Sequence, residues 1–285
     1  MGRRRSGGDE MSARRRISIA SYRPPREGVI HGSMTLDCSK VAKYLAEVNA
    51  AGAQGRDASP VTITAFVGAV VGRALRASPS LNGRIHLGRY IPHERVNVAF
   101  LVQVNDGENL AQVLVEDIDE LSPVEVHSQL RAKAEAVRSG KDENFEKSIN
   151  LMRRMPTPIL RRVLSFGGFV TTGLGLPFAG QPAFPFGSAV ITSVGMLGVD
   201  EAFVPPTPFL RVPLYVAIGR MRDMVFAESG EPVVRPGITL TATLDHRFID
   251  GFQAGVLAKK VREGFDNPWL LGPDADVGRG SAAPN

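Results

Sequence analysis

Hydrophobic positions follow helical spacing in several separate stretches of the chain. Apolar residues recur every three or four positions over 37–52 and again over 251–265. The stretch 61–83 is apolar on nearly all sides, and Ser59 and Pro60 before it fit an N-cap followed by a proline in the first turn. These patterns predict two amphipathic helices and, between them, one deeply buried helix.

Local signals add a further helix and a set of strands. Ser122 and Glu125 have the spacing of a capping box, and Pro123 occupies the first helical position, which predicts a helix over 121–141. Apolar or alternating runs typical of strands lie at 95–104, 109–117, 186–197, 213–221 and 237–245. The sequence therefore predicts the α+β class, with helices and strands interleaved around a mostly β core.

The stretch 163–199 contains no charged residue, which raises the question of a membrane span. Pro177, Pro182 and Pro185 leave no helix of the roughly 20 residues that a bilayer requires. We therefore expect an apolar loop followed by a buried strand, and no transmembrane segment.

The formal charge of +5 is concentrated at the start of the chain. Residues 1–16 hold six arginines against two acidic residues, and the rest is nearly neutral. A folded body without a basic stripe argues against nucleic-acid binding. A transit peptide is an alternative, but the stretch is short and carries acids, so we expect a disordered basic tail over 1–13.

Cys38 is the single cysteine of the chain. It excludes an internal disulfide framework and a cysteine-based metal cluster, and it favours a reducing, cytoplasmic location. Its place at a helix start allows a low thiol pKa, but no base is paired with it, so we do not expect a nucleophile.

The candidate chemistry lies in TLDHRFIDGF, where His246 stands between a strand and a helix. An imidazole accepts and returns protons near neutral pH, which suits a general base. Asp250 and Gln253 form a D-x-x-Q capping pair for the last helix. The alternative is that His246 is a hydrogen-bonded core histidine and that Asp250 only caps the helix.

The segment DHRFIDG resembles the D-H-R-x-x-D-G motif of the catalytic domain of dihydrolipoyl acyltransferases, the core subunits of 2-oxoacid dehydrogenase complexes. Its H-x-x-x-D-G part is shared with the wider chloramphenicol acetyltransferase-like superfamily. Further stretches similar to the family follow in its order: RRRISIASYRPPREGVIHGSMTLDCSKV, TITAFVGAVVGRALRASPSLNGRI, VNVAFLVQVNDGENLAQVLVEDIDELSPVEV and AVITSVGMLGVDEAF.

The resemblance implies a fold, a chemistry and a set of site residues. The fold is a chloramphenicol acetyltransferase-like two-layer sandwich of a mixed β-sheet and flanking helices. His246 matches the catalytic base, Thr192 the hydroxyl that stabilises the oxyanion, with Ser193 as the backup, and Asp250 the acid that fixes the site. We interpret His31 as structural. The arginine partner of Asp250 is one of Arg15, Arg16 and Arg23, and the residues that bind CoA stay unassigned.

The resemblance also implies the reaction and the assembly. An acyl group moves directly between CoA and a dihydrolipoyl thiol without an acyl-enzyme, in a channel between neighbouring subunits of a homotrimer that can build a larger cubic or shell assembly. Acyl-CoA is a substrate, and no metal is expected. We expect neither a lipoyl domain nor a lipoyl attachment site in this chain, so the lipoyl group would arrive on a separate protein.

Residues 142–187 exceed the family's usual connection, beginning as a basic amphipathic helix and becoming an apolar loop. We expect this insertion at the trimer seam or the acceptor side; peripheral membrane contact and core packing are the alternatives. The catalytic domain is expected over 14–272, with a flexible tail over 273–285. Two other functions stay open: a CoA-dependent O- or N-acyltransferase of a small metabolite, and an assembly scaffold with vestigial chemistry.

Overall fold

The computed structural model describes residues 28–52, 59–86, 88–104, 109–138 and 155–272. The expected tails at 1–13 and 273–285 and residues 105–108 between two predicted strands lie outside the described residues, as do Arg15, Arg16 and Arg23.

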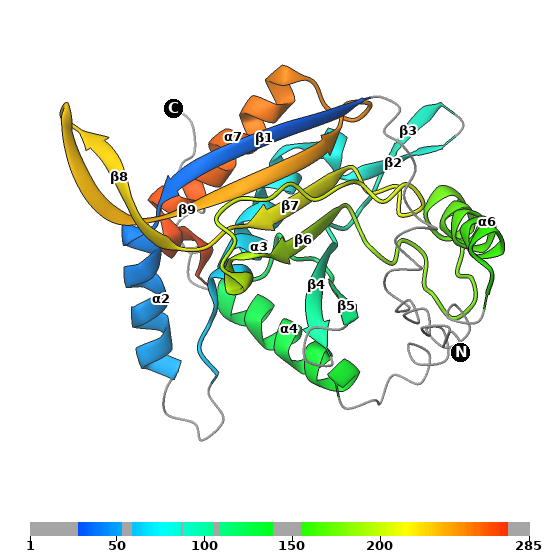
Figure 1. Cartoon of the computed structure of the whole chain (residues 1–285), viewed down its shortest axis with the longest axis horizontal. Coiled ribbons are helices and arrows are strands. Elements are labelled where there is room, and N and C mark those ends of the chain that lie inside the picture. Colours follow the sequence, from blue (N-terminus) through cyan, green and yellow to red (C-terminus); the bar gives the residue numbers. More distant parts are fainter. Residues whose placement is uncertain (1–27, 53–58, 87, 105–108, 139–154, 273–285) are drawn as a thin grey trace, which may run out of the picture.

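A seven-stranded mixed sheet forms one layer of the molecule, in the order β1-β9-β7-β6-β4-β5 with β8 pairing to β9 (Figure 1). β6 runs parallel to both β4 and β7, and the other neighbouring pairs are antiparallel. The strands are β1 (Val29–Asp37), β4 (Val98–Val104), β5 (Asn109–Val115), β6 (Ala189–Ser193), β7 (Leu214–Ile218), β8 (Arg222–Glu228) and β9 (Glu231–Asp245). A separate hairpin joins β2 (Gly83–His86) and β3 (Arg89–Pro92).

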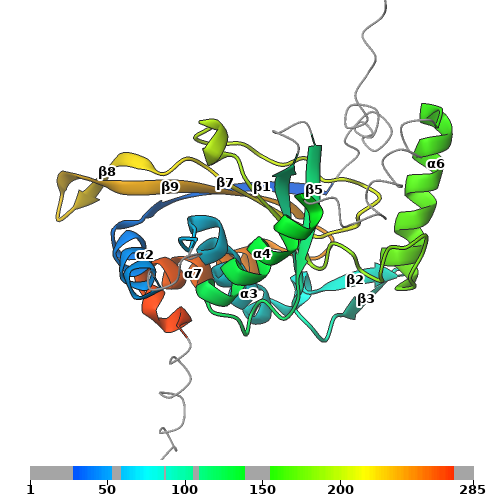
Figure 2. The same ribbon diagram turned by 90° about the horizontal axis from the view of Figure 1, so that it is seen from below.

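Helices cover one face of the sheet, as the view in Figure 2 shows. They are α2 (Ser39–Gly52), α3 (Ile63–Ala77), α4 (Pro123–Arg138) and α7 (Gly251–Asp266). Their apolar side chains meet those of the strands in the main core, with Phe66 and Phe100 among its largest fully buried side chains. Short 3-10 turns lie at Pro79–Leu81, Gly195–Leu197 and Pro268–Leu271. The predicted α+β class and two-layer sandwich are confirmed.

The buried helix is confirmed as α3, but both of its predicted ends were wrong: the start is shifted, and the helix ends at Ala77 instead of residue 83. The N-cap is Thr62, whose side chain accepts a hydrogen bond from the Ala65 N–H at 3.3 Å. Asn49 of α2 explains the shift: its Oδ1 accepts from the Val61 N–H at 2.7 Å, and its Nδ2 donates to the Val61 carbonyl at 3.3 Å. These two bonds hold Val61 to a neighbouring helix, so the helix begins after it. Ser59 and Pro60 therefore precede the helix instead of opening it.

The capping box of α4 is confirmed. The Ser122 N–H donates to Glu125 Oε2 at 2.7 Å, and the Glu125 N–H donates to Ser122 Oγ at 3.3 Å. Both donors would otherwise lack partners at a helix start. The same carboxylate also accepts from the Ser122 hydroxyl, and these bonds lower the pKa of Glu125.

A long hairpin of β8 and the first half of β9 projects from one end of the sheet (Figure 1). The sequence did not predict it, because Pro232 and Pro236 interrupt the strand pattern of the segment before 237. Here Pro236 lies opposite Asp223, and its carbonyl accepts from the Cys38 N–H at 2.7 Å. Tertiary pairing thus continues the strand through residues that disfavour it locally.

Among the described residues of the insertion, α6 (Thr157–Gly168) is followed by a π-helical turn, η3 (Phe169–Leu174). The expectation of an apolar loop from residue 163 was therefore wrong up to Leu174. Gly175 ends the turn with φ of 72°, a conformation that glycine adopts at little cost. In both views α6 stands at the end of the molecule opposite the β8–β9 hairpin (Figures 1 and 2).

In the described part of the chain, no helix is long and apolar enough to cross a membrane. Within the same residues, no group of three or more histidine, cysteine, aspartate or glutamate side chains is arranged to hold a metal ion.

Candidate active site

His246 lies on the short turn between β9 and α7. Its backbone N–H donates to the Gly28 carbonyl at 2.6 Å, which ties the turn to the start of β1. Phe248 and Ile249 anchor the turn in the core, being 7% and 2% exposed. The His246 side chain is exposed, and among the described residues its ring makes no hydrogen bond. The fold thus holds an accessible imidazole on a rigid support, and the alternative of a core histidine does not fit.

Asp245 stabilises this turn through hydrogen bonds with Arg247. Both of its carboxylate oxygens accept from Arg247 Nε, at 2.9 and 3.1 Å, and Arg247 Nη2 also contacts the carboxylate. The Arg247 N–H donates to Asp245 Oδ1 at 3.0 Å. The hydrogen bonds to Asp245 raise the pKa of Arg247. The carboxylate beside the candidate base is therefore engaged in shaping the loop.

Asp250 is the N-cap of α7. Its carboxylate accepts from the Phe252 N–H at 2.9 Å and from the Gln253 N–H at 3.2 Å, and Gln253 Oε1 accepts from the Asp250 N–H at 2.8 Å. The capping pair seen in the sequence is confirmed. Its predicted partners Arg15, Arg16 and Arg23 lie outside the described residues, so an arginine contact stays a prediction.

Replacing Asp250 with alanine is expected to lower the free energy of unfolding by about 1 kcal/mol, because it leaves two helix N–H donors without a cap. Asparagine retains the accepting oxygen and is expected to cost only a few tenths of a kcal/mol. Urea unfolding followed by circular dichroism measures both. Asp266→Ala, at the other end of α7, is the control and is expected to be neutral or slightly stabilising. An equal loss in all three variants would contradict the capping role.

Thr192 lies in the centre of the sheet, on β6. Its neighbours in register are Leu101 on β4 and Ala217 on β7. Side chains alternate along a strand, so Thr192 shares the face of Val190, which packs in the smaller core cluster away from the helices. Ser193 shares the opposite face with Ile191, a member of the main core. Of the two candidate hydroxyls, Thr192 is the one on the face free of α2, α3, α4 and α7.

One protomer does not bring Thr192 and His246 together. Through Ala217, Thr192 lies level with Thr241 on β9, five residues before His246. A strand rises by about 3.4 Å per residue, and neighbouring strands lie about 4.8 Å apart, so the two positions differ by about 17 Å along the strands and about 10 Å across them. A site that uses both side chains therefore needs a second copy of the chain.

The structure also defines the surroundings of His31 and Cys38. His31, on β1, contacts Thr243 Oγ1 through Nδ1 at 3.3 Å and meets the Phe203 ring edge-on at 5.2 Å between centroids. Cys38 is fully buried, and burial raises the pKa of its thiol to about 12. A thiol with that pKa is protonated at neutral pH, so Cys38 is not a nucleophile in this fold.

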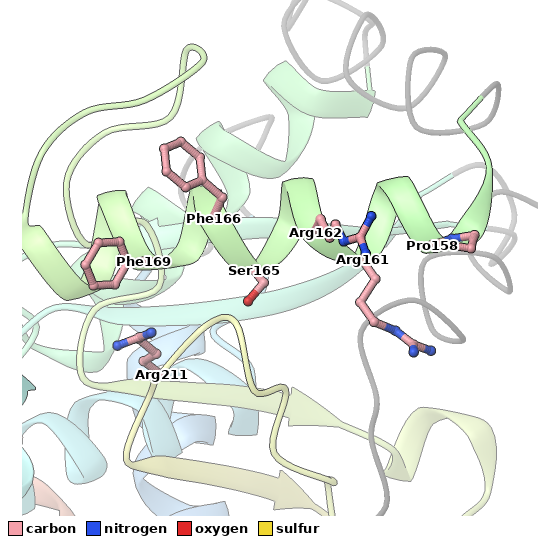
Figure 3. A pocket seen from close by; sticks show the side chains of 7 residues that line it. All are labelled: Pro158, Arg161, Arg162, Ser165, Phe166, Phe169 and Arg211. Atoms are coloured by element: carbon pink, nitrogen blue, oxygen red, sulfur yellow. The ribbon is translucent and has the colours of Figure 1, made fainter.

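Sequence reasoning missed a pocket at the His246 end of the sheet. It is lined by residues of α6 and η3 together with Arg211, which precedes β7 (Figure 3). The Arg161–Arg162 pair was a partial signal, because it belongs to the stretch that the sequence predicts as a basic amphipathic helix. Arg211 carries no motif, and only tertiary packing places it there.

Comparisons with known proteins identify the family and the fold of the chain. The model of the family "2-oxoacid dehydrogenases acyltransferase (catalytic domain)" matches residues 29–147 and 184–272 and leaves 148–183 unmatched. The dihydrolipoyllysine-residue acetyltransferase component of the acetoin cleaving system of Bacillus subtilis is 25% identical over 242 residues, 84% of this chain and 50% of that protein. The succinyltransferase component of the 2-oxoglutarate dehydrogenase complex of Haemophilus influenzae is 24% identical over 208 residues, 72% of this chain and 40% of that protein. The chain thus spans half or less of the length of these curated relatives.

Solved structures show the same fold. A probable dihydrolipoamide acetyltransferase from Listeria monocytogenes superimposes with a TM-score of 0.64 at 15% identity, covering 94% of this chain and 92% of that one. The cubic core of a pyruvate dehydrogenase multienzyme complex gives 0.62 at 16% identity, covering 85% and 83%. Together with the matched model, these likenesses show that the chain belongs to the family of 2-oxoacid dehydrogenase acyltransferase catalytic domains.

Proposed function

We propose that this chain transfers acyl groups between CoA and a dihydrolipoyl thiol carried on a separate polypeptide. The observation that carries the proposal is the exposed imidazole of His246, on a braced turn, within a segment that the family model matches. The curated relatives are acetyl- and succinyltransferases that act on dihydrolipoyllysine residues. Acyl transfer between thiols requires a base that can return its proton, which a histidine provides.

The proposed reaction is a direct thioester exchange. His246 removes the proton from the acceptor thiol, and the thiolate attacks the carbonyl carbon of the acyl-CoA. The Thr192 hydroxyl donates a hydrogen bond to the oxygen that becomes negatively charged. When the tetrahedral intermediate collapses, the bond between carbon and the CoA sulfur breaks, and His246 returns the proton to the CoA thiolate. No acyl-enzyme is formed.

The two side chains would meet across a subunit boundary. Within one protomer, Thr192 and His246 lie too far apart to act on the same carbonyl group. A neighbouring copy can instead present its Thr192 to His246 of the first copy. The solved cubic core of a related complex supports an assembly of several copies. A homotrimer is the smallest arrangement that the resemblance implies.

A related solved structure supports the residue types. The dihydrolipoamide acetyltransferase of Azotobacter vinelandii, which is 16% identical to this chain, was solved to define the roles of one serine, one histidine and one asparagine in its catalytic mechanism. The asparagine there follows the histidine by four residues, as Asp250 follows His246 here. We propose that Thr192, His246 and Asp250 take the corresponding positions.

The acceptor is tested by release of free CoA thiol from acetyl-CoA. Dihydrolipoamide is expected to support turnover, and small alcohols and amines are expected not to. Turnover with an alcohol or an amine, but not with dihydrolipoamide, would instead identify an O- or N-acyltransferase. No turnover with any acceptor, in a protein that assembles, would leave the scaffold function.

Mixing two inactive variants tests the shared site. His246→Ala and Thr192→Val protomers are unfolded and refolded together in equal amounts. They are expected to regain about a quarter of wild-type activity, because one subunit interface in four then pairs an intact His246 with an intact Thr192 on the adjacent copy. Each variant refolded alone is the control and stays inactive. If the mixture also stayed inactive while assembling normally, the two groups would not act across a boundary.

A further inference from the structure

An open pocket of about 550 Å³ lies between α6 and the chain segment that leads into β7 (Figure 3). Three arginines, two phenylalanines, a proline and a serine line it, and none of these residues is acidic. Specific small-molecule sites commonly measure about 300–1,000 Å³ and combine apolar walls with a few polar groups. The size and composition of this pocket fit that description.

The pocket concentrates positive charge. Arg161, Arg162 and Arg211 all line it, and within the described residues neither Arg162 nor Arg211 forms an ion pair. The like charges of Arg162 and Arg211, which have no carboxylate partner among the described residues, create a positive potential that attracts anions. Partial burial and, to a lesser extent, the nearby Arg247 guanidinium lower the pKa of Arg211. A bound anion would be stabilised by this positive potential.

Arg211 is built into the fold. Its φ of 54° is a left-handed conformation that is uncommon for residues other than glycine. Its guanidinium carbon lies 5.4 Å from the centre of the Phe169 ring, a cation–π contact. At Gly168, a side-chain carbon would lie 1.9 Å from the Phe209 carbonyl oxygen, so α6 packs directly on the chain beside Arg211. The position of the charge relative to α6 is therefore fixed before any ligand binds.

The remaining walls suit the apolar body of a ligand. Phe166 and Phe169 are 57% and 39% exposed, so part of each ring presents apolar surface. Ser165 lies one position before Phe166 and points toward the side of α6 that Arg211 occupies (Figure 3). The pocket therefore offers aromatic surface next to guanidinium and hydroxyl donors. This combination matches a small organic acid better than a bare inorganic ion.

The location links the pocket to the acyl-transfer site. Arg211 is close enough to Arg247 for the Arg247 guanidinium to contribute to the lowered pKa of Arg211, and Arg247 follows His246 directly. Most of the α6 wall lies in 148–183, the segment that the family model leaves unmatched. The pocket is thus a feature of this chain added to the family's fold, beside the turn that holds the candidate base.

We propose that this pocket binds a small carboxylic acid or carboxylate-bearing substrate group, with the carboxylate held by Arg211, Arg162 and Ser165 and the apolar body packed on Phe166 and Phe169. The role in substrate selection rests on the proposed function; the binding itself does not. An apolar acid bound at Arg211, within electrostatic range of Arg247, would define the class of acyl group or acceptor that the enzyme uses.

Calorimetric titration of the full chain with 3-phenylpropanoate, compared with the uncharged 3-phenylpropanamide, tests the proposal without CoA or a lipoyl group. We expect saturable millimolar binding of the acid, as suits a probe of this size, and at least about 10-fold weaker binding of the amide. Arg211→Gln and Arg162→Gln are each expected to weaken the acid about 10-fold or more, because each removes a charge-assisted hydrogen bond. Phe166→Ser is expected to weaken the acid and the amide alike.

Arg262→Gln, on an exposed position of α7 outside the pocket, is the matched control and is expected to bind as the wild type does. Ser165→Ala, a small change on an exposed helix position, keeps the test valid should an arginine variant misfold. Equal binding of acid and amide, an equal loss in the control, or no saturation would overturn the proposal. So would co-sedimentation with phosphatidylglycerol vesicles without binding of the acid, since α6 would then be a membrane contact. A protein that binds the acid but transfers no acyl group would refute the proposed function and leave this pocket standing.

Discussion

Replacing His246 with alanine is expected to lower kcat for acyl transfer from acetyl-CoA to dihydrolipoamide by about 10²–10⁴-fold. The imidazole is the proposed group that takes the proton from the acceptor thiol and returns it to the leaving thiolate. Its side chain is exposed and, among the described residues, carries no hydrogen bond, so its removal should leave the fold intact. Thiol release followed at saturating substrate gives kcat, and circular dichroism with light scattering checks fold and assembly.

His86→Ala is the matched control, since it removes the same type of side chain from the β2–β3 hairpin. It is expected to retain turnover close to that of the wild type. A His246→Ala enzyme with unchanged kcat would rule out the general-base role. A loss of assembly in the His246→Ala variant would instead indicate that His246 acts in subunit contact and not in catalysis.

Replacing Thr192 with valine is expected to lower kcat by about 10²–10³-fold with little change in KM, because a donor aimed at the oxyanion acts mainly in the transition state. Valine has nearly the same shape, so the central strand β6 should keep its packing. Thr192→Ser retains the hydroxyl and should recover most of the rate. Steady-state kinetics of the three proteins separates kcat from KM.

Ser193→Ala serves as the control for this position, because Ser193 lies on the opposite face of the same strand. It is expected to leave kcat unchanged. If Ser193→Ala lost the activity and Thr192→Val did not, the oxyanion donor would be the neighbouring residue, and the face argument for Thr192 would be wrong.

The elements that the sequence predicted well are those with strong local signals. The capping pairs Ser122–Glu125 and Asp250–Gln253 form as their spacing indicates, because each pair satisfies N–H groups within one turn. The strands β6 and β7, the second half of β9 and the buried helix α3 follow from their apolar periods. The motif around His246 was readable for the same reason, since it lies within a few consecutive residues.

The misjudged elements depend on partners far along the chain. The start of α3 is moved by Asn49, which binds the backbone of Val61 twelve residues away. The β8–β9 hairpin extends through Pro236 because that residue is paired on a neighbouring strand. The helical part of the insertion runs past its two adjacent glycines because Gly168 allows contact with the Phe209 backbone. In each case a non-local contact outweighs the local preference of the residues concerned.

The sequence by itself determined the α+β class, the family motif, and His246, Thr192 and Asp250 as candidates, since residue types and short spacings carry that information. Tertiary structure alone decided that Thr192 faces the side of the sheet free of helices, that it lies far from His246 within one protomer, and that Arg211 meets α6 in a charged pocket. Strand order, register and packing bring together or separate residues that are distant in the chain, and no local pattern encodes those distances.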